Sequence, residues 1–341
     1  MNDIHVVLDH LDQIKLPAFL ATIVHVEGSA YKKESACMLI QNDGTSSGFI
    51  SAGCLEQDLI ERVKRGEDSQ TITYDMSAED DIAFGMGAGC NGIIHVLLER
   101  IESGYLTHLQ QVNKLVRSGK EVLMMKDLFQ NNYLFIPEGE KPFGSATHFS
   151  SLEVEHVIDQ ASLGGANKKV YTQVGNPIFL QRISPKPRLI LFGAGEDALP
   201  LVKVAADVGF NVVVSDWRQS FCAVERFPEA THVLHGFPKA AVQALDLSSK
   251  DFVILMTHHF EHDRTLLQLL RGRGLSFLGV LGSAKRTARL VEQEEVPTDV
   301  RSPVGLSIGA QGATEIAVSI VAELIQMIRS STTCVNKVLV Q

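Results

Sequence analysis

Hydrophobic and polar positions follow two different periods in the first half of the chain. Apolar residues recur at helical spacing over 1–15, which predicts an amphipathic helix that ends before Pro17. Apolar runs bounded by turn residues predict strands at 18–28 and on both sides of a turn at 42–44. The pattern also predicts helices at 54–66 and 105–119, and strands at 71–76, 121–129 and after a glycine-rich loop within 85–101. The first half is therefore expected to be a mixed α/β domain.

The second half changes to short, continuous apolar runs that alternate with helical segments. Strands are predicted at 188–193, 211–216, 231–236, 252–257, 275–282 and 303–309, and helices at 196–208, 239–246, 262–271, 283–294 and 313–329. This alternation is typical of a doubly wound parallel sheet covered on both faces. The segment SPKPRL, with two prolines and two basic residues, predicts a domain boundary. We therefore expect an N-terminal domain over 1–184 and a C-terminal domain over 185–341.

Composition narrows the classes of function. The 341-residue chain is 45% hydrophobic with a net charge of -9, which argues against nucleic acid as the main partner but leaves a small anionic ligand open. The N-terminus does not have the pattern of a signal peptide, and the apolar runs are too short to span a bilayer, so a cytoplasmic protein with no membrane partner is expected. Five cysteines without C-x-x-C spacing predict free thiols and no structural metal site.

The sequence LILFGAGEDALP contains the sharpest single pattern. Gly193, Gly195 and Ala198 form G-x-G-x-x-A between a predicted strand and a predicted helix, and Asp216 ends the next strand. This arrangement predicts a Rossmann-like domain whose helix N-terminus can receive a phosphate. Glu196 would repel that phosphate or cap the helix, and the glycines could also serve strand–helix packing alone.

The sequence MTHHFEHD follows the predicted strand 252–257, at the sheet edge where such folds bind ligands. His258, His259, His262 and Asp263 would be candidates for proton transfer beside a nicotinamide. They also resemble metal ligands, but adjacent histidines point apart and a metal would need ligands from elsewhere. Asp263 near the start of a helix is in any case a favourable N-terminal charge.

Two cysteines stand beside glycines in the first domain. Cys54 in SAGCLEQD ends a strand and opens a helix, where the helix dipole favours a thiolate. From its neighbours alone, a structural role for Cys54 as a small buried apolar residue is favoured over a functional role, because free cysteine is among the most buried residue types. Cys90 lies in GAGCNG, where a tight loop that accepts only small side chains explains it as well as a functional role does.

Four stretches together resemble the xanthine dehydrogenase accessory proteins, the XdhC/CoxI family. They are GCLEQD at 53–58, GMGAGCNGIIHVLLE at 85–99, the glycine turn ending in SDWR at 215–218, and the segments MTHHFEHD, FLGVLGSAKRTARL and PVGLSIGAQGATEIAVSIVAELI. The resemblance covers nearly the whole chain, and the middle, about 105–180, contributes little. It favours ligand contact for Cys54.

The resemblance implies a non-catalytic chaperone for the molybdenum cofactor, a pterin dithiolene. Such proteins bind this molybdopterin, hold it while a cysteine desulfurase supplies the terminal sulfido ligand, and deliver it to a molybdenum hydroxylase such as xanthine dehydrogenase. The residues that the resemblance assigns to cofactor binding are Gly53, Cys54, Glu56, Gly89, Cys90, Gly193, Gly195, Asp216, Arg218, His258 and Asp263.

The chain departs from the family pattern at two places. The loop after Gly28 reads SAYKKESACML where an arginine-proline-glycine turn is expected, so any phosphate role there would fall to Lys32 or Lys33. The glycine turn carries Glu196 where a histidine is common, which leaves the ligand of that turn open.

Two other classes of function compete with the chaperone hypothesis. One is an NAD(P)-dependent oxidoreductase, in which Asp216 contacts a ribose and a His258–Asp263 pair carries the proton. The other is a scaffold that keeps the Rossmann-like fold only to dock partners. In each case a homodimer is expected from the prevalence of symmetric oligomers.

Overall fold

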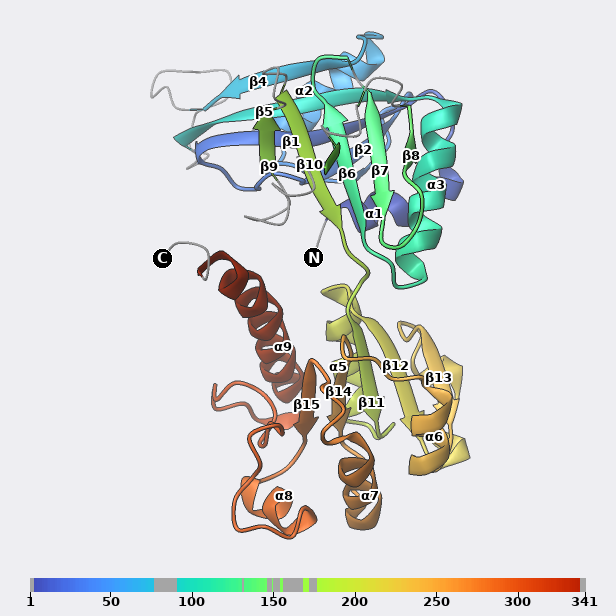
Figure 1. Ribbon diagram of the computed structural model, residues 1–341, viewed down its shortest axis with the longest axis vertical. Helices are drawn as coiled ribbons and strands as arrows, with labels where there is room; N and C mark the ends of the chain where they lie inside the picture. The colour runs from blue at the N-terminus through green and yellow to red at the C-terminus, as the bar shows by residue number, and fades with distance from the viewer. Residues whose placement is uncertain are drawn as a thin grey trace. The chain divides into compact units, whose positions relative to one another are not determined.

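The computed structural model describes residues 3–76, 91–130, 132–145, 149, 154–155, 168–171 and 177–337. These residues form two compact units, one reaching Pro185 and the other spanning Lys186–Lys337 (Figure 1). We call them unit 1 and unit 2 and describe each by itself.

Unit 1 contains two antiparallel sheets. The first has the order β3-β2-β1-β5-β4 and consists of β1 (Ala18–Ser29), β2 (Cys37–Gln41), β3 (Ser46–Gly48), β4 (Gln70–Asp75) and β5 (Asn91–Ile101). The second has the order β8-β7-β6-β10-β9 and consists of β6 (Val122–Asp127), β7 (Tyr133–Pro137), β8 (Phe143–Gly144), β9 (Lys168–Tyr171) and β10 (Pro177–Ile183). Every strand pair in these sheets is antiparallel.

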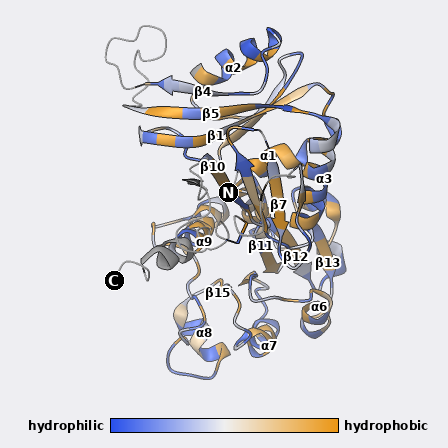
Figure 2. Cartoon of the chain, turned by 45° about the horizontal axis from the view of Figure 1, so that its top comes forward, coloured by the Kyte–Doolittle hydropathy of each residue, from blue (hydrophilic) through white to orange (hydrophobic). Residues whose placement is uncertain are grey.

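Helices cover both faces of the first sheet of unit 1. Leu55, Leu59 and Val63 of α2 (Cys54–Lys64) pack against apolar side chains of β1, β2, β4 and β5. On the opposite face, α1 (Ile4–Asp9) and α3 (Ser103–Arg117) share a core with both sheets. Figure 2 shows α2 on one side of β1 and β5, and α1 and α3 on the other.

A buried ion pair connects the two sheets of unit 1. The Lys126 ammonium of β6 contacts the Glu99 carboxylate of β5, and both residues are almost fully buried. Burial lowers the pKa of Lys126 to about 7. Removing one member of such a pair leaves a buried charge without its partner. We therefore expect the loss of either residue to weaken the contact between the two sheets.

The first helix is shorter than predicted. The expected helix over 1–15 is α1 followed by a separate 3-10 turn, Leu11–Gln13. The His10 ring donates from Nδ1 to the Val6 carbonyl at 2.7 Å, while the His10 amide bonds to Val7 instead. The side chain thus occupies the carbonyl that the next α-helical amide bond would use, and the α-helix ends there.

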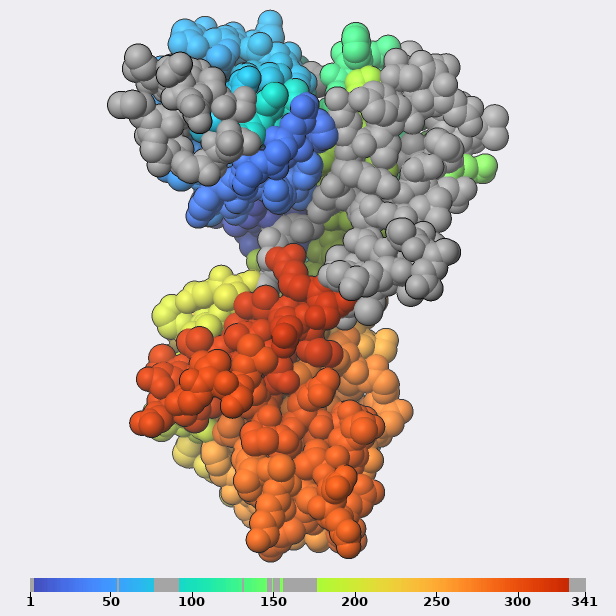
Figure 3. Space-filling view, turned by 90° about the vertical axis from the view of Figure 1, so that its left-hand side faces the viewer, coloured from blue at the N-terminus to red at the C-terminus, as the bar shows by residue number. Residues whose placement is uncertain are grey.

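Unit 2 is a parallel sheet of order β13-β12-β11-β14-β15, which confirms the predicted doubly wound fold. Its strands are β11 (Arg188–Phe192), β12 (Asn211–Asp216), β13 (His232–His235), β14 (Phe252–Leu255) and β15 (Phe277–Val280). One face is covered by α5 (Ala198–Asp207) and α9 (Gly312–Lys337), and the other by α6 (Pro238–Ala244), α7 (Phe260–Leu270) and α8 (Ala284–Leu290). Figure 3 shows α9, in red, across one side of the unit.

The predicted strand at 303–309 was wrong. Arg301 forms an isolated parallel bridge with Gly279, and the Val304 amide donates to the Val280 carbonyl at 3.2 Å, but no strand forms. Gly305 then turns the chain with φ 102° and donates its amide to Glu323 of α9 at 2.7 Å. The apolar run therefore packs under α9 as an irregular segment, with Val304 buried against Gly279.

Candidate functional site

The segment around Cys54 is a compact loop that leads into α2. Gly53 precedes the helix with φ 122°, and a Cβ placed on it would meet none of the described atoms within 4 Å. Ala52 and Gly53 are both exposed. Cys54 is the first residue of α2, and its side chain lies outside the described part of the structure.

Glu56 organises this loop from the first turn of the helix. Its carboxylate accepts hydrogen bonds from the amides of Ile50, Ser51 and Gly53 at 2.8, 2.5 and 3.0 Å, and from the Ser51 hydroxyl. Burial by itself raises the pKa of Glu56, but the bonds from Ser51 and the backbone amides outweigh it and hold the pKa below its ordinary value. The ionised carboxylate therefore fixes the loop beside Cys54.

The second predicted pair, Gly89 and Cys90, lies outside the described residues. The strand that follows, β5, begins at Asn91 and pairs with the end of β1. Gly92 approaches β1 so closely that a Cβ would lie 2.4 Å from the Glu27 carbonyl.

In unit 2 the glycine turn connects β11 to α5, as the sequence predicts. Gly193 has φ 126°, and a Cβ there would lie 2.2 Å from the Met256 carbonyl at the end of β14. A Cβ on Gly195 would lie 2.6 Å from an Asp197 carboxylate oxygen. Backbone contacts within the unit therefore explain Gly193, whereas Gly195 meets only the end of a side chain that can move.

Asp216 is engaged inside the protein. Its side chain accepts the Ala194 amide at 2.8 Å and pairs with the Arg218 guanidinium at 2.8 Å, and it is fully buried. Burial by itself raises the pKa of Asp216, but the hydrogen bonds from Arg218 and the Ala194 amide hold it below its ordinary value. The acid that would meet a ribose in an NAD site here joins two strand ends.

Two more acid–base pairs cross the glycine turn. Glu196 pairs with Arg226 at 2.6 Å, and Arg226 also donates to the Ala194 carbonyl. Asp197 pairs with Nε2 of His258 at 2.7 Å, and His258 adopts φ 57°, which is uncommon for a non-glycine residue. These pairs place two carboxylates where a pyrophosphate would need positive charge.

Sequence reasoning did not find Asp197 or Arg226. Arg226 lies thirty positions after its partner Glu196, and such long-range pairing leaves no periodic signal in the sequence. Asp197 stands next to Glu196 in the turn, so its acidic character was visible but its partner was not.

Asp263 belongs to a different network from His258. It is 1% exposed, accepts the Thr257 hydroxyl at 2.7 Å and pairs with Arg286 of α8 at 2.6 Å. The predicted His258–Asp263 proton pair is not formed, because His258 turns towards Asp197.

The remaining histidines pack with aromatic rings at the carboxyl edge of the sheet. The rings of His259 and His262 lie 4.1 Å apart between centroids, and Trp217 lies 4.9 Å from His262. Burial lowers the pKa of His262, and His259 adds to this effect. Within the described residues, no group of three or more His, Cys, Asp and Glu side chains could hold a metal ion.

A small apolar cavity of about 30 Å³ lies near the ends of β14 and β15. It is lined by residues of α5 and α9, of the glycine turn, and of the segments after β14 and β15: Asp197, Leu201, Met256, Leu281, Ala313, Ile316, Ala317 and Ile320. Ligand sites for small molecules usually have volumes of about 300–1,000 Å³. A dinucleotide does not fit this cavity without displacement of α9.

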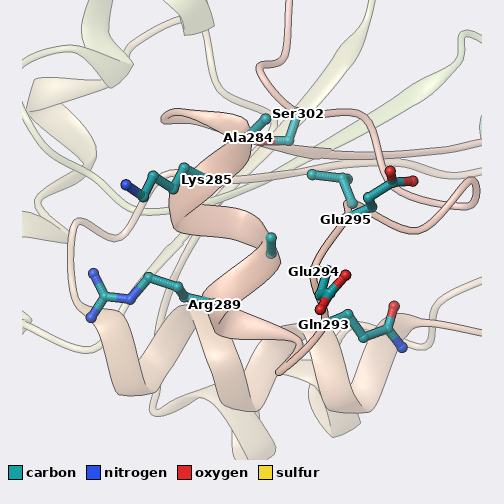
Figure 4. Close-up of a pocket in the computed structure, with 9 residues that line it drawn as sticks. Ala284, Lys285, Arg289, Gln293, Glu294, Glu295 and Ser302 are labelled. Atoms are coloured by element: carbon teal, nitrogen blue, oxygen red, sulfur yellow. The ribbon is translucent and has the colours of Figure 1, made fainter.

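A larger, open hollow of about 490 Å³ lies beside α8. Figure 4 shows Lys285 and Arg289 extending away from Glu294 and Glu295, so these charges do not converge on one point. None of the predicted site residues lines this hollow.

The predicted residues thus form separate groups. Gly53 and Glu56 organise the start of α2 in unit 1. Gly193, Gly195, Asp216, Arg218 and His258 meet around the glycine turn of unit 2, with Asp263 in the adjoining network. None of the described helices is long and apolar enough to cross a membrane.

Sequence profiles match three parts of this chain. The XdhC and CoxI family matches residues 14–75, the BH1974-like central domain matches 103–184, and the XdhC Rossmann domain matches 189–324. The first two matches fall in unit 1, and the match to the Rossmann domain falls in unit 2.

Similar proteins extend this result over nearly the full length. The chain is 43% identical to a Bacillus subtilis protein named as a probable xanthine dehydrogenase subunit, covering 96% of this chain and 98% of that one. A crystal structure of a xanthine dehydrogenase (BH1974) from Bacillus halodurans superposes with a TM-score of 0.85 and 42% identity, covering 97% of this chain and 96% of the other. The molybdenum cofactor insertion chaperone PaoD of Escherichia coli is 24% identical, covering 90% of this chain and 82% of PaoD. The chain belongs to the XdhC and CoxI family.

Proposed function

We propose that this protein binds the molybdenum cofactor, protects it while a cysteine desulfurase supplies the terminal sulfido ligand, and delivers it to a xanthine dehydrogenase-type molybdenum hydroxylase. The observation that carries the proposal is the ordered loop before Cys54 in a chain of this family. Its relative PaoD bears the name of a molybdenum cofactor insertion chaperone. The protein acts as a carrier and performs no catalysis of its own.

The start of α2 suits the cofactor in its chemistry. Gly53 is exposed and has open space where a side chain would stand, so a ligand can approach the backbone beside Cys54. A soft thiolate is a suitable neighbour for a molybdenum–sulfur centre, and the bound cofactor supplies that centre. Glu56 is fully used in holding the loop, so its role in our proposal is to position Gly53 and Cys54. We include Gly89 and Cys90 as proposed contacts on the basis of the family pattern.

The predicted cofactor residues of unit 2 play a different part in this proposal. The polar groups of Asp216, Arg218, His258 and Asp263 are paired within the unit. A ligand at Gly193 and Gly195 would have to exchange these contacts for its own. We therefore propose that unit 1 holds the cofactor.

The glycine turn favours a second candidate function, an NAD(P)-dependent oxidoreductase. Its strand–turn–helix arrangement and Asp216 have the pattern of a dinucleotide site. The internal pairing of Asp216, the two carboxylates at the turn and the small cavity favour it less than the carrier function. Titration with NADH and NADPH tests it directly: micromolar binding with turnover of a substrate would establish an oxidoreductase.

The proposed partners are the hydroxylase and the cysteine desulfurase, in the cytoplasm, with the carrier as a homodimer. Co-purification with each partner and light scattering of the purified protein test these assignments. A monomer in solution would contradict the proposed homodimer but not the carrier function.

The decisive experiment measures molybdenum and pterin in protein purified from cells that make the cofactor. We expect the wild-type protein to retain both and to activate a cofactor-free hydroxylase. The Cys54→Ser variant should remain folded and retain at least tenfold less cofactor than the wild type. Cys222→Ser, in unit 2, is the matched thiol control and should retain it. A wild-type protein without molybdenum, pterin or activating capacity would overturn the proposal.

A further inference from the structure

Unit 1 exposes an aromatic pair next to the loop that leads to Cys54. Tyr31 is 61% exposed and Phe49 is 46% exposed, although large aromatic side chains usually pack in cores. Their ring centroids lie 6.4 Å apart with a tilt of 46°. Phe49 directly precedes the Ile50–Gly53 loop that wraps around the Glu56 carboxylate.

Two lysines accompany this pair. The Lys32 ammonium lies 4.0 Å from the centroid of the Phe49 ring, and it is held there by an ion pair of 3.0 Å with Asp3. Lys33, the next residue, is exposed. Asp3 balances the charge of Lys32, so Lys33 supplies the exposed positive charge beside this aromatic pair.

The loop that carries Tyr31 and the lysines is braced against β1. The Ser35 amide bonds to the Ile23 carbonyl and the Ile23 amide to the Ala36 carbonyl, both at 2.9 Å. Ser35 is buried with φ 75°, a conformation that a non-glycine residue keeps only where its surroundings hold it. Glu34 accepts the Val26 amide at 3.1 Å. Preorganisation of this kind lowers the ordering cost of binding.

We propose that Tyr31, Phe49, Lys32 and Lys33 form a binding site for a flat heteroaromatic ring that carries a phosphate. The ring stacks on Tyr31 and on the part of Phe49 that Lys32 leaves open, and the phosphate pairs with Lys33, with Lys32 beside it. A pterin phosphate and a purine nucleotide share this chemistry. The assignment deepens the proposed function, on which it rests for the choice of pterin as the first ligand, because the organic part of the molybdenum cofactor is a pterin with a phosphate.

The test uses 6-hydroxymethylpterin monophosphate as a fluorescent probe, titrated with the full-length protein and followed by anisotropy. Stacking on one aromatic ring changes affinity by roughly ten- to a hundredfold, so Tyr31→Ala and Phe49→Ala should each weaken binding by about that factor. Phe129→Ala is the matched control, because Phe129 is an 81% exposed aromatic residue of the same unit, and its variant should bind like the wild type.

A second arm separates the ring from the phosphate. Lys33→Ala should weaken binding of the phosphorylated probe several-fold and leave 6-hydroxymethylpterin without phosphate unchanged, whereas Lys141→Ala should change neither. Competition by GMP shows which source of the ring is preferred: displacement of the probe by equimolar GMP assigns the site to nucleotides, and its absence assigns it to pterins.

The inference is overturned if the wild-type protein does not bind the probe or GMP below millimolar concentration, or if Tyr31→Ala and Phe49→Ala bind as the wild type does. This failure is distinct from failure of the carrier function. A wild-type protein that retains molybdenum through Cys54 yet ignores both aromatic substitutions keeps the carrier function and loses only the aromatic site.

Discussion

The protein contains two strand-to-helix turns that begin alike and use their acidic residues differently. Gly53 before α2 and Gly193 before α5 both have φ near 125°, and an acid follows three residues later in each. Glu56 turns back onto the amides of its own loop. Around the second turn, Glu196 and Asp197 contact the side chains of Arg226 and His258 from other parts of unit 2.

We propose that this difference decides which of the two turns receives a ligand. The Glu56 carboxylate bonds within the first turn, and no described atom lies within 4 Å of the position of a Cβ on Gly53. The second turn is tied to the end of β12 through Asp216 and to the segment after β14 through His258. Close packing thus accounts for Gly193 in the glycine pattern of unit 2, and we propose that the turn of unit 1 is the one that binds a ligand.

The largest effect is expected at Gly193. Gly193→Ala should lower the free energy of unfolding of unit 2 by about 4 kcal/mol, because the Cβ would lie 2.2 Å from the Met256 carbonyl at φ 126°. Fluorescence of Trp217, the single tryptophan, follows unit 2 during urea unfolding. Gly53→Ala meets no atom and should cost only about 1–2 kcal/mol, seen in unit 1 by circular dichroism. Equal losses at the two glycines would refute the contrast.

Asp216 should come next. Asp216→Asn removes the partner of Arg218 at a buried position and should cost about 3 kcal/mol in urea unfolding followed by Trp217 fluorescence. Arg218→Gln added to Asp216→Asn should recover part of this loss, because no unpaired charge remains. A double variant as unstable as the sum of the two single variants would show that the ion pair between Asp216 and Arg218 does not stabilise unit 2.

Glu56→Gln should lower the stability of unit 1 by about 2 kcal/mol at pH 7, because the carboxylate bonds to several amides. The folded-state pKa of Glu56 is lowered, so its contribution is present above the unfolded value of about 4.3 and is lost as the pH falls through the folded pKa. Urea unfolding of wild type and variant from pH 7 to pH 3 should therefore converge at the acidic end. A constant difference would assign the effect to packing.

The smallest effect is expected for Asp197→Asn. Its partner His258 is 61% exposed, so the pair should contribute less than about 1 kcal/mol. This variant also tests whether negative charge excludes a dinucleotide from the glycine turn, because it removes one carboxylate from the place where the phosphate would lie. We expect no NADH binding in isothermal titration, and micromolar binding would show that charge alone kept the dinucleotide out.

Much of the fold could be predicted from local pattern. The parallel strands of unit 2 are continuous apolar runs, and their alternation with helices leaves few other arrangements. The strand prediction at 303–309 was wrong because an apolar run is compatible both with a strand and with an irregular segment under a helix. The turn at Gly305 and its bond to Glu323 distinguish these two structures. His10 ended the first helix through a side-chain contact that hydrophobic periodicity does not record.

The sites were predicted less completely because their contacts are long-range. The residues around both glycine turns were found from their patterns, but the pairing of His258 with Asp197 depends on how two strand ends meet. The aromatic pair in unit 1 joins residues 31 and 49, which carry no shared motif. Exposure of Tyr31 and Phe49 becomes visible only when the surrounding core is complete.

The place of β5 in unit 1 imposes an order on folding during synthesis. β5 lies between β1 and β4 in the sheet, although β4 is made first. β4 thus leaves the ribosome before its partner strand β5 has been made. Glu99 of β5 then has no ion-pair partner until Lys126 is synthesised 27 residues later. Because domains fold as units during translation, the whole unit becomes stable only after β10 has emerged. The nascent protein must therefore keep the Cys54 segment in an unfinished domain for more than a hundred residues of synthesis.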